Sequence, residues 1–268
     1  MKNLLSILAL LIVGATPVCA AEVVTFPSGT LQLKAMVWKP DGAGPFPAVL
    51  FNHGSERNHQ KAFEAVGPFF AGAGYVMFAP FRRGHGMSGD QGAFIGEVLN
   101  DVNKREGIDA RSRMALQLLE ADHFDDQQAA LEYLRKLPYV DAKRVAVAGV
   151  SFGGIQTMLM AERGGDVRAA VNFSGAALNW ERSPLIRERM LEAGRRAKIP
   201  VYLIQAENDQ STGPSKDIAA EMLRLGLPHR MKIYPPFGKT VSDGHSFGYY
   251  GADIWGQEVL AFLREALK

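Results

Sequence analysis

Cysteine is almost absent from this sequence, with Cys19 the single one among 268 residues. It stands at the end of an N-terminal segment in which Lys2 precedes an apolar run over residues 4–13, and Ala20 and Ala21 follow it. This order is typical of a secretory signal peptide and its cleavage site. We therefore expect residues 1–20 to be removed and the mature protein to be periplasmic or secreted. The mature chain would then have no cysteine, which excludes disulfides, thiolate metal sites and a cysteine nucleophile.

Long hydrophobic runs and an excess of charge of one sign are also missing. The N-terminal apolar run is far shorter than the roughly 20 residues that span a bilayer. We expect no stable membrane insertion after signal removal. The alternative is that this segment is retained as a membrane anchor. The 30 Lys and Arg residues nearly balance the 28 Asp and Glu residues, so no field concentrates a polyanion. We expect a small-molecule partner and no nucleic acid; the oligomeric state is not indicated.

The remaining residues, 21–268, alternate short apolar segments with longer amphipathic ones. No repeat, low-complexity tract or linker divides them, which predicts one domain. The alternation is typical of a mostly parallel sheet of about eight strands with helices on both faces. Strands are predicted at 23–26, 31–38, 47–52, 75–79, 144–148, 167–173, 201–205 and 230–234, the first two as an antiparallel pair. Helices are predicted near 59–73, 125–137, 152–162, 214–225 and 254–267, with helical inserts at 94–122 and 176–198.

Two segments match the pattern Gly-x-Ser-x-Gly, around Ser151 and around Ser246. The first follows a predicted strand and opens a predicted helix, which is the context of a nucleophile elbow. The second follows a turn and has no histidine after it, so we interpret Ser246 as a loop serine. Ser151 is the predicted nucleophile; the alternative is a serine that only caps a helix.

A serine nucleophile needs an imidazole to take its proton and an acid to orient that imidazole. The chain order Ser, acid, His leaves His229 and His245. We predict His245, because His229 precedes a strand and would lie at the far end of the sheet. Among acids we predict Asp209 over Glu207, since both follow the strand at 201–205 but Glu207 lies close to the strand end. Either carboxylate could instead be a turn residue.

An oxyanion hole is predicted from two backbone N–H groups. Phe152, directly after the nucleophile, supplies the first. The segment after the strand at 47–52 supplies the second, for which we favour Ser55 over Gly54. His53 in the same segment is interpreted as a buried support for the loop rather than as a catalytic group.

These motifs resemble the α/β-hydrolase superfamily, and within it the dienelactone-hydrolase-like and related esterase or peptidase branch. The similar segments span nearly the whole mature chain: 53–54, 81–88, 149–154, 208–209 and 244–247. Dienelactone hydrolases proper use a cysteine nucleophile, whereas this chain has Ser151, so the resemblance leaves open whether the substrate is an ester, a lactone or a peptide. Arg82 and Arg83 could hold a substrate carboxylate or only anchor their loop. Trp180, in the second insert, could contact substrate or belong to the core.

The sequence thus predicts a serine esterase of the α/β-hydrolase fold. It would cleave carboxylic esters through an acyl-enzyme on Ser151, with no metal or organic cofactor. Arg83 and Trp180 are the predicted substrate contacts. Two alternatives are a serine peptidase that resembles the catalytic domains of prolyl oligopeptidases, and a binding protein that has kept the fold without the chemistry.

Overall fold

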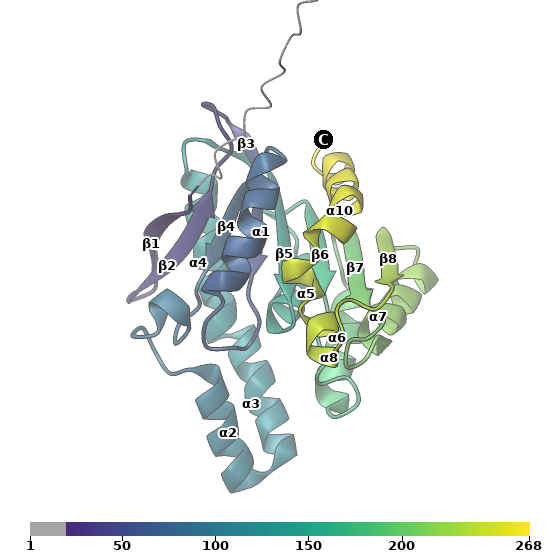
Figure 1. The fold of residues 1–268 in the computed structure, drawn as a ribbon. Coiled ribbons are helices and arrows are strands. Elements are labelled where there is room, and N and C mark those ends of the chain that lie inside the picture. Colours follow the sequence, from purple (N-terminus) through teal and green to yellow (C-terminus); the bar gives the residue numbers. More distant parts are fainter. Residues whose placement is uncertain (1–19) are drawn as a thin grey trace, which may run out of the picture.

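The computed structural model describes residues 20–268, in which eight strands form one sheet (Figure 1). The strand order is β1-β2-β4-β3-β5-β6-β7-β8. Only β2 runs against the others, because it pairs antiparallel with both β1 and β4 while the remaining pairs are parallel. The strands are β1 (Glu22–Ser28), β2 (Leu31–Trp38), β3 (Phe46–Asn52), β4 (Val76–Pro80), β5 (Val140–Val150), β6 (Ala169–Phe173), β7 (Val201–Ala206) and β8 (His229–Tyr234). The predicted mostly parallel sheet of eight strands is confirmed.

The middle strands are buried on both faces, which explains their continuous apolar sequences. Every residue of β4, β6 and β7 is buried. The edge strand β8 is instead mostly exposed or half-buried. The core of the sheet therefore lies at its central strands. Functional groups of such sheets collect at the C-terminal ends of the strands, here those of β3, β5 and β7.

Helices cover both faces of the sheet, as predicted. They are α1 (Gln60–Gly72), α2 (Ile95–Glu106), α3 (Ile108–Glu120), α4 (Asp122–Lys136), α5 (Phe152–Arg163), α6 (Pro184–Arg195), α7 (Gly213–Arg224), α8 (Val241–His245), α9 (Phe247–Tyr250) and α10 (Ala252–Ala266), with a short 3₁₀ helix at Gly86–Ser88.

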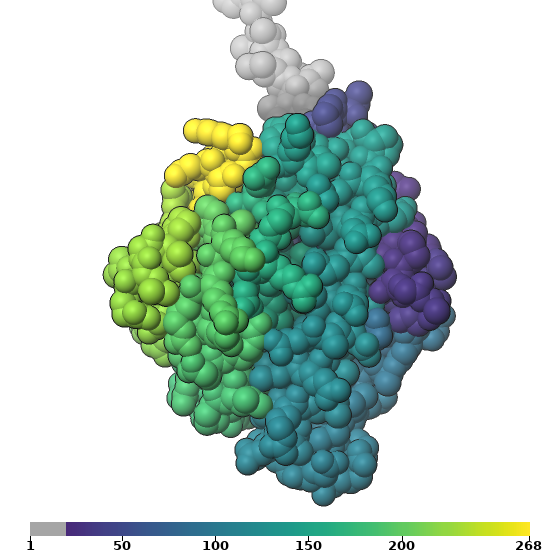
Figure 2. Space-filling model, turned by 180° about the vertical axis from the view of Figure 1, so that it is seen from behind, coloured from purple at the N-terminus to yellow at the C-terminus, as the bar shows by residue number. Residues whose placement is uncertain are grey.

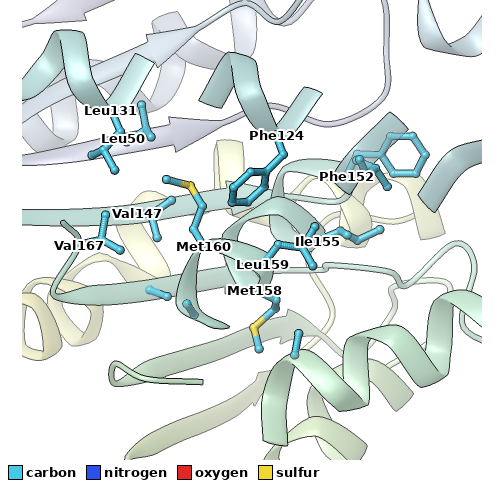
Figure 3. Packing of buried hydrophobic residues seen from close by; sticks show 14 of the residues in the cluster. Leu50, Phe124, Leu131, Val147, Phe152, Ile155, Met158, Leu159, Met160 and Val167 are labelled. Carbon is cyan, nitrogen blue, oxygen red and sulfur yellow. The ribbon is translucent and has the colours of Figure 1, made fainter. Parts of the chain in front are cut away.

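The two faces have separate hydrophobic cores. On one face the sheet packs against α1 and α10, which lie in front of it in Figure 1. On the other face the core includes residues of α3 to α7. Figure 3 shows part of it, where Leu50 and Val147 of the sheet lie near Leu131 of α4 and Met160 of α5. Figure 2 views the molecule from this side, and the teal and green surface of these helices covers the sheet.

Both predicted inserts are helical. Residues 94–122 form α2 and α3, a helical hairpin that extends away from the sheet in Figure 1. Residues 176–198 contain α6, whose first turn is capped by Ser183, with its side chain accepting the N–H of Ile186. The first insert lies between β4 and β5 in the chain, and the second lies between β6 and β7.

The predicted export signal and Cys19 lie outside the described residues, apart from Ala20 at the border. Within residues 20–268, no helix combines the length and the apolar character that crossing a membrane requires.

Candidate active site

Ser151 occupies a sharp turn between β5 and α5. Its backbone angles are φ 59° and ψ −118°, in a region that residues with a side chain rarely adopt. The turn is held by two backbone hydrogen bonds, from Ser151 N to Phe173 O at 3.0 Å and from Ile155 N to Ser151 O at 3.0 Å. A strained serine at the C-terminal end of a central strand has the geometry of a nucleophile elbow.

The glycines around Ser151 permit this turn by close approach of backbone to backbone. A Cβ atom on Gly153 would lie 2.0 Å from Asn52 O, and one on Gly149 would lie 2.4 Å from Gly153 O. Only residues without a side chain fit at both positions. The Gly-x-Ser-x-Gly spacing is therefore required here by packing of α5 against the end of β3.

Asp209 and His245 are joined by a hydrogen bond. Asp209 lies in the turn after β7, and its Oδ1 is 2.8 Å from Nδ1 of His245. Gln205 Nε2 donates to Asp209 Oδ2 at 2.8 Å, and Gln210 N donates to Oδ1 at 2.7 Å. The Asp209 side chain is fully buried, whereas 16 % of the His245 side chain is exposed. With its proton on Nδ1, His245 presents Nε2 as a proton acceptor.

His245 ends a short helix, α8, where a loop was expected. The cause is a capping box: the Thr240 side chain accepts the N–H of Asp243, and the Asp243 side chain accepts the N–H of Thr240. The sequence signal is a threonine followed three residues later by an acid, which the loop prediction overlooked. A Cβ on Gly244 would lie 2.6 Å from Asn208 Oδ1, so the helix packs closely against the turn that carries Asp209.

Ser151 and His245 line the same cavity, whose volume is about 420 Å³. Ser55, Leu178 and Tyr249 also line it. No hydrogen bond joins Ser151 Oγ to His245 in residues 20–268, and His245 Nε2 is buried without a partner. Hydrogen bonds between catalytic groups are often long without substrate and tighten when it binds.

The other residues considered for these roles lie elsewhere. Glu207 is exposed, with its backbone N–H bonded to Tyr234 O at 2.8 Å. His229 is the first residue of β8, at the far end of the sheet, and its Nδ1 lies 2.9 Å from Leu227 O. Ser246, expected as a loop serine, follows α8 and lines the cavity beside Ser151. The structure thus brings Ser151, Asp209 and His245 together and leaves Glu207 and His229 apart.

The two expected oxyanion donors come from different segments of the chain. Phe152 begins α5, and Ser55 lies on the cavity wall after β3. The alternative donor, Gly54, gives its N–H to Tyr249 Oη at 2.9 Å. Tyr249 did not emerge from the sequence, where nothing separates it from an ordinary core tyrosine. Burial raises the pKa of Tyr249, so its hydroxyl stays protonated.

Arg83 and Trp180, the predicted substrate contacts, do not lie on the wall of this cavity. Arg83 forms an ion pair with Asp126 at 2.7 Å, which ties its loop to α4. Trp180 is 2 % exposed and donates from Nε1 to Asp217 at 3.0 Å. These contacts fit the anchoring role considered for Arg83 and the core role considered for Trp180.

A cluster of four buried histidines surrounds Arg82 beside the cavity. The ring centroid of His53 lies 4.8 Å from that of His59 and 4.8 Å from that of His85, and His85 lies 5.7 Å from His123. Burial, and after it the positive charge of Arg82, lowers the pKa of His59 to about 3 and that of His123 to about 2. The pKa of His85 falls to about 2 and that of His53 well below its usual value, for the same reasons. All four rings are therefore neutral at physiological pH.

Comparison with known proteins places this chain in a family. The sequence profile described as the dienelactone hydrolase family matches residues 33–252. Polyketide transferase grgF of Penicillium sp. is 27 % identical over 199 residues, which cover 70 % of this chain and 60 % of that protein. The "Putative carboxymethylenebutenolidase" of Synechocystis sp. is 27 % identical over 218 residues, which cover 79 % of this chain and 82 % of that protein.

Solved structures show the same fold. The acylaminoacyl peptidase of Pyrococcus horikoshii aligns with 92 % of this chain at a TM-score of 0.67 and 18 % identity. This chain covers only 42 % of that peptidase. The likeness, together with the strand order, confirms the predicted α/β-hydrolase fold.

Proposed function

The chain belongs to the dienelactone hydrolase family and is a hydrolase, and on that premise we propose that it is a serine esterase acting on small carboxylic esters. One observation carries the proposal. A serine in a strained turn shares a cavity with a histidine, His245, whose other ring nitrogen is held at 2.8 Å by the buried carboxylate of Asp209. That arrangement is what an activated serine requires.

The proposed reaction has two halves. His245 takes the proton of Ser151 as its oxygen attacks the ester carbonyl, and the N–H groups of Phe152 and Ser55 stabilise the resulting oxyanion. The C–O bond to the alcohol breaks, and the alcohol leaves with the proton from His245. Water then attacks the acyl-enzyme, gives its proton to His245, and the acid is released as Ser151 regains its proton. Side chains, backbone N–H groups and water are sufficient for every step.

The cavity supports a small substrate. A volume of about 420 Å³ lies in the range typical of pockets for small molecules. Its wall combines apolar groups, such as Leu178 and Val150, with the polar side chains of Glu56 and Lys61. A cavity of this volume suits a small acyl or alcohol group better than a long polymer.

Labelling with a fluorophosphonate tests the proposal. We expect the probe to modify Ser151, as identified by mass spectrometry of peptides, and Ser151→Ala to abolish both labelling and ester hydrolysis. The matched control is Ser246→Ala, the serine of the other Gly-x-Ser-x-Gly segment, which should still be labelled at Ser151. An unlabelled wild-type protein, or an active Ser151→Ala variant, would refute the proposal.

Substrate panels separate ester from peptide hydrolysis. The protein should turn over nitrophenyl esters of short acids and leave aminoacyl nitroanilides largely intact. Amides need effective protonation of the leaving amine, whereas activated esters do not. Comparable kcat/KM values on both substrates would instead favour a peptidase.

A further inference from the structure

Arg82 is a buried cation with no carboxylate partner. It is 1 % exposed, and no ion pair among residues 20–268 includes it, since the nearby Asp126 pairs with Arg83. Its Nη1 donates to His53 O and to Gln156 Oε1, both at 2.7 Å. Its Nη2 donates to Gly54 O at 2.7 Å. Burial lowers the pKa of Arg82 to about 10, so the guanidinium is charged at neutral pH, and all its hydrogen-bond acceptors are neutral oxygen atoms.

His53 adds a second donor to the same carbonyl. Its Nε2 accepts the backbone N–H of Arg82 at 3.1 Å, which places the ring proton on Nδ1. Nδ1 then donates to Gly54 O at 2.8 Å. Both lone pairs of this carbonyl oxygen are therefore engaged, one of them by a charged donor.

The carbonyl of Gly54 belongs to the same peptide group as the N–H of Ser55. That peptide is planar and trans, so its N–H points away from Arg82 and His53. Hydrogen bonds to a carbonyl polarise the whole amide and make its N–H a stronger donor, most of all in a site of low dielectric constant. The neighbouring N–H, that of Gly54, is already bonded to Tyr249.

We propose that Arg82 is a positioning residue of the oxyanion hole, which acts from behind the Gly54–Ser55 peptide. It fixes the orientation of this peptide and polarises it, so that the Ser55 N–H binds the negative oxygen of the tetrahedral intermediate more strongly. The inference rests on the proposed esterase function. Because the oxyanion exists only after attack by Ser151, the effect falls on kcat rather than on KM.

Gln156 offers a test that leaves Arg82 in place. In Gln156→Glu a carboxylate would face Arg82 Nη1, neutralise its charge and draw it from the Gly54 carbonyl. We expect kcat to fall about tenfold with KM nearly unchanged. The inhibition constant of a trifluoromethyl ketone, which forms a tetrahedral adduct with serine, should rise by about the same factor.

Gln156→Leu is the matched control. It also removes the hydrogen bond from Gln156 Nε2 to His123 O, but it adds no charge and leaves Arg82 bonded to the loop. It should keep the kcat and the inhibitor affinity of the wild type. Arg82→Lys, which keeps the charge without the planar fork, should show a smaller loss of kcat than Gln156→Glu.

The outcomes distinguish this inference from the esterase proposal. If fluorophosphonate labels Ser151 and esters are cleaved, yet Gln156→Glu keeps its kcat and inhibitor affinity, the positioning role is wrong and the esterase stands. A rise in KM together with a lower melting temperature, at unchanged kcat, would likewise overturn it, because a purely structural role predicts that result. A tenfold loss confined to kcat and inhibitor affinity, absent in Gln156→Leu, supports it.

Discussion

Tyr249 Oη accepts the backbone N–H of Gly54 at 2.9 Å, which links two segments 195 residues apart in the sequence. The tyrosine comes from α9, which follows the helix α8 that ends at His245, and the glycine follows β3. This bond therefore connects the segment that holds the imidazole to the segment that holds the expected oxyanion donor.

Tyr249→Phe should destabilise the protein. It leaves a buried N–H without a partner, which costs about 1–3 kcal/mol. Urea titration at neutral pH would measure the loss. Tyr250→Phe, at a neighbouring tyrosine that is 51 % exposed, should change the free energy of unfolding by less than about 0.5 kcal/mol. Equal stability of the two variants would contradict the assigned bond.

Asp209→Asn should lower kcat about ten-thousand-fold with little change in KM. Both carboxylate oxygens accept N–H groups, from Gln205, Gln210 and His245. An amide in their place turns an NH₂ group toward one of these donors and disturbs the imidazole tautomer. Turnover of a nitrophenyl ester measures the effect. Glu207→Gln, which removes the other candidate acid, should retain activity, and the reverse pattern would exchange the two assignments.

Gly153→Ala should destabilise the protein by about 3 kcal/mol or more, or prevent folding. Its Cβ would meet the backbone oxygen of Asn52 at 2.0 Å, and a backbone atom cannot move aside easily. Gly72→Ala is the control, because a Cβ there meets nothing within 4 Å at the end of α1. It should be neutral or stabilise by up to about 1 kcal/mol. Soluble yield and thermal unfolding report both, and a stable Gly153→Ala protein would be inconsistent with the packing of α5.

The buried histidines predict loss of stability in acid. Their folded pKa values, about 3 for His59 and about 2 for His85 and His123, lie below the value of about 6.5 in an unfolded chain. Between these limits the unfolded state binds more protons. The stability that the neutral rings contribute is therefore complete above about pH 6.5 and is lost as the pH falls toward 3.

Each such histidine adds a slope of up to about 1.4 kcal/mol per pH unit to the free energy of unfolding. Urea titrations at about pH 7.5 and about pH 5 should show the decrease. His123→Asn should reduce this slope near pH 5 by about 1.4 kcal/mol per pH unit, which is the contribution of one proton, whatever its effect on stability at neutral pH. A free energy of unfolding that does not change between the two pH values would rule out this protonation scheme.

Much of the fold could be predicted, because strands buried on both faces leave continuous apolar runs and helices leave amphipathic ones. Boundaries were less accurate. β5 begins at Val140, ahead of the predicted 144–148, and β6 begins at Ala169 within the predicted 167–173. The helix at Val241–His245 was expected as a loop, because five residues are too few to show a hydrophobic period.

Local sequence alone indicated the elbow, since a strand, the Gly-x-Ser-x-Gly segment around Ser151 and a helix follow one another along the chain. It also narrowed the acid to two carboxylates and the base to two histidines. Only the tertiary structure shows that Asp209, and not Glu207, is hydrogen-bonded to His245, and that the N–H of Gly54 is bonded to Tyr249. A hydrogen bond requires two groups to come within about 3 Å. That distance depends on strand register and helix packing across the whole sheet, which no short segment of sequence encodes.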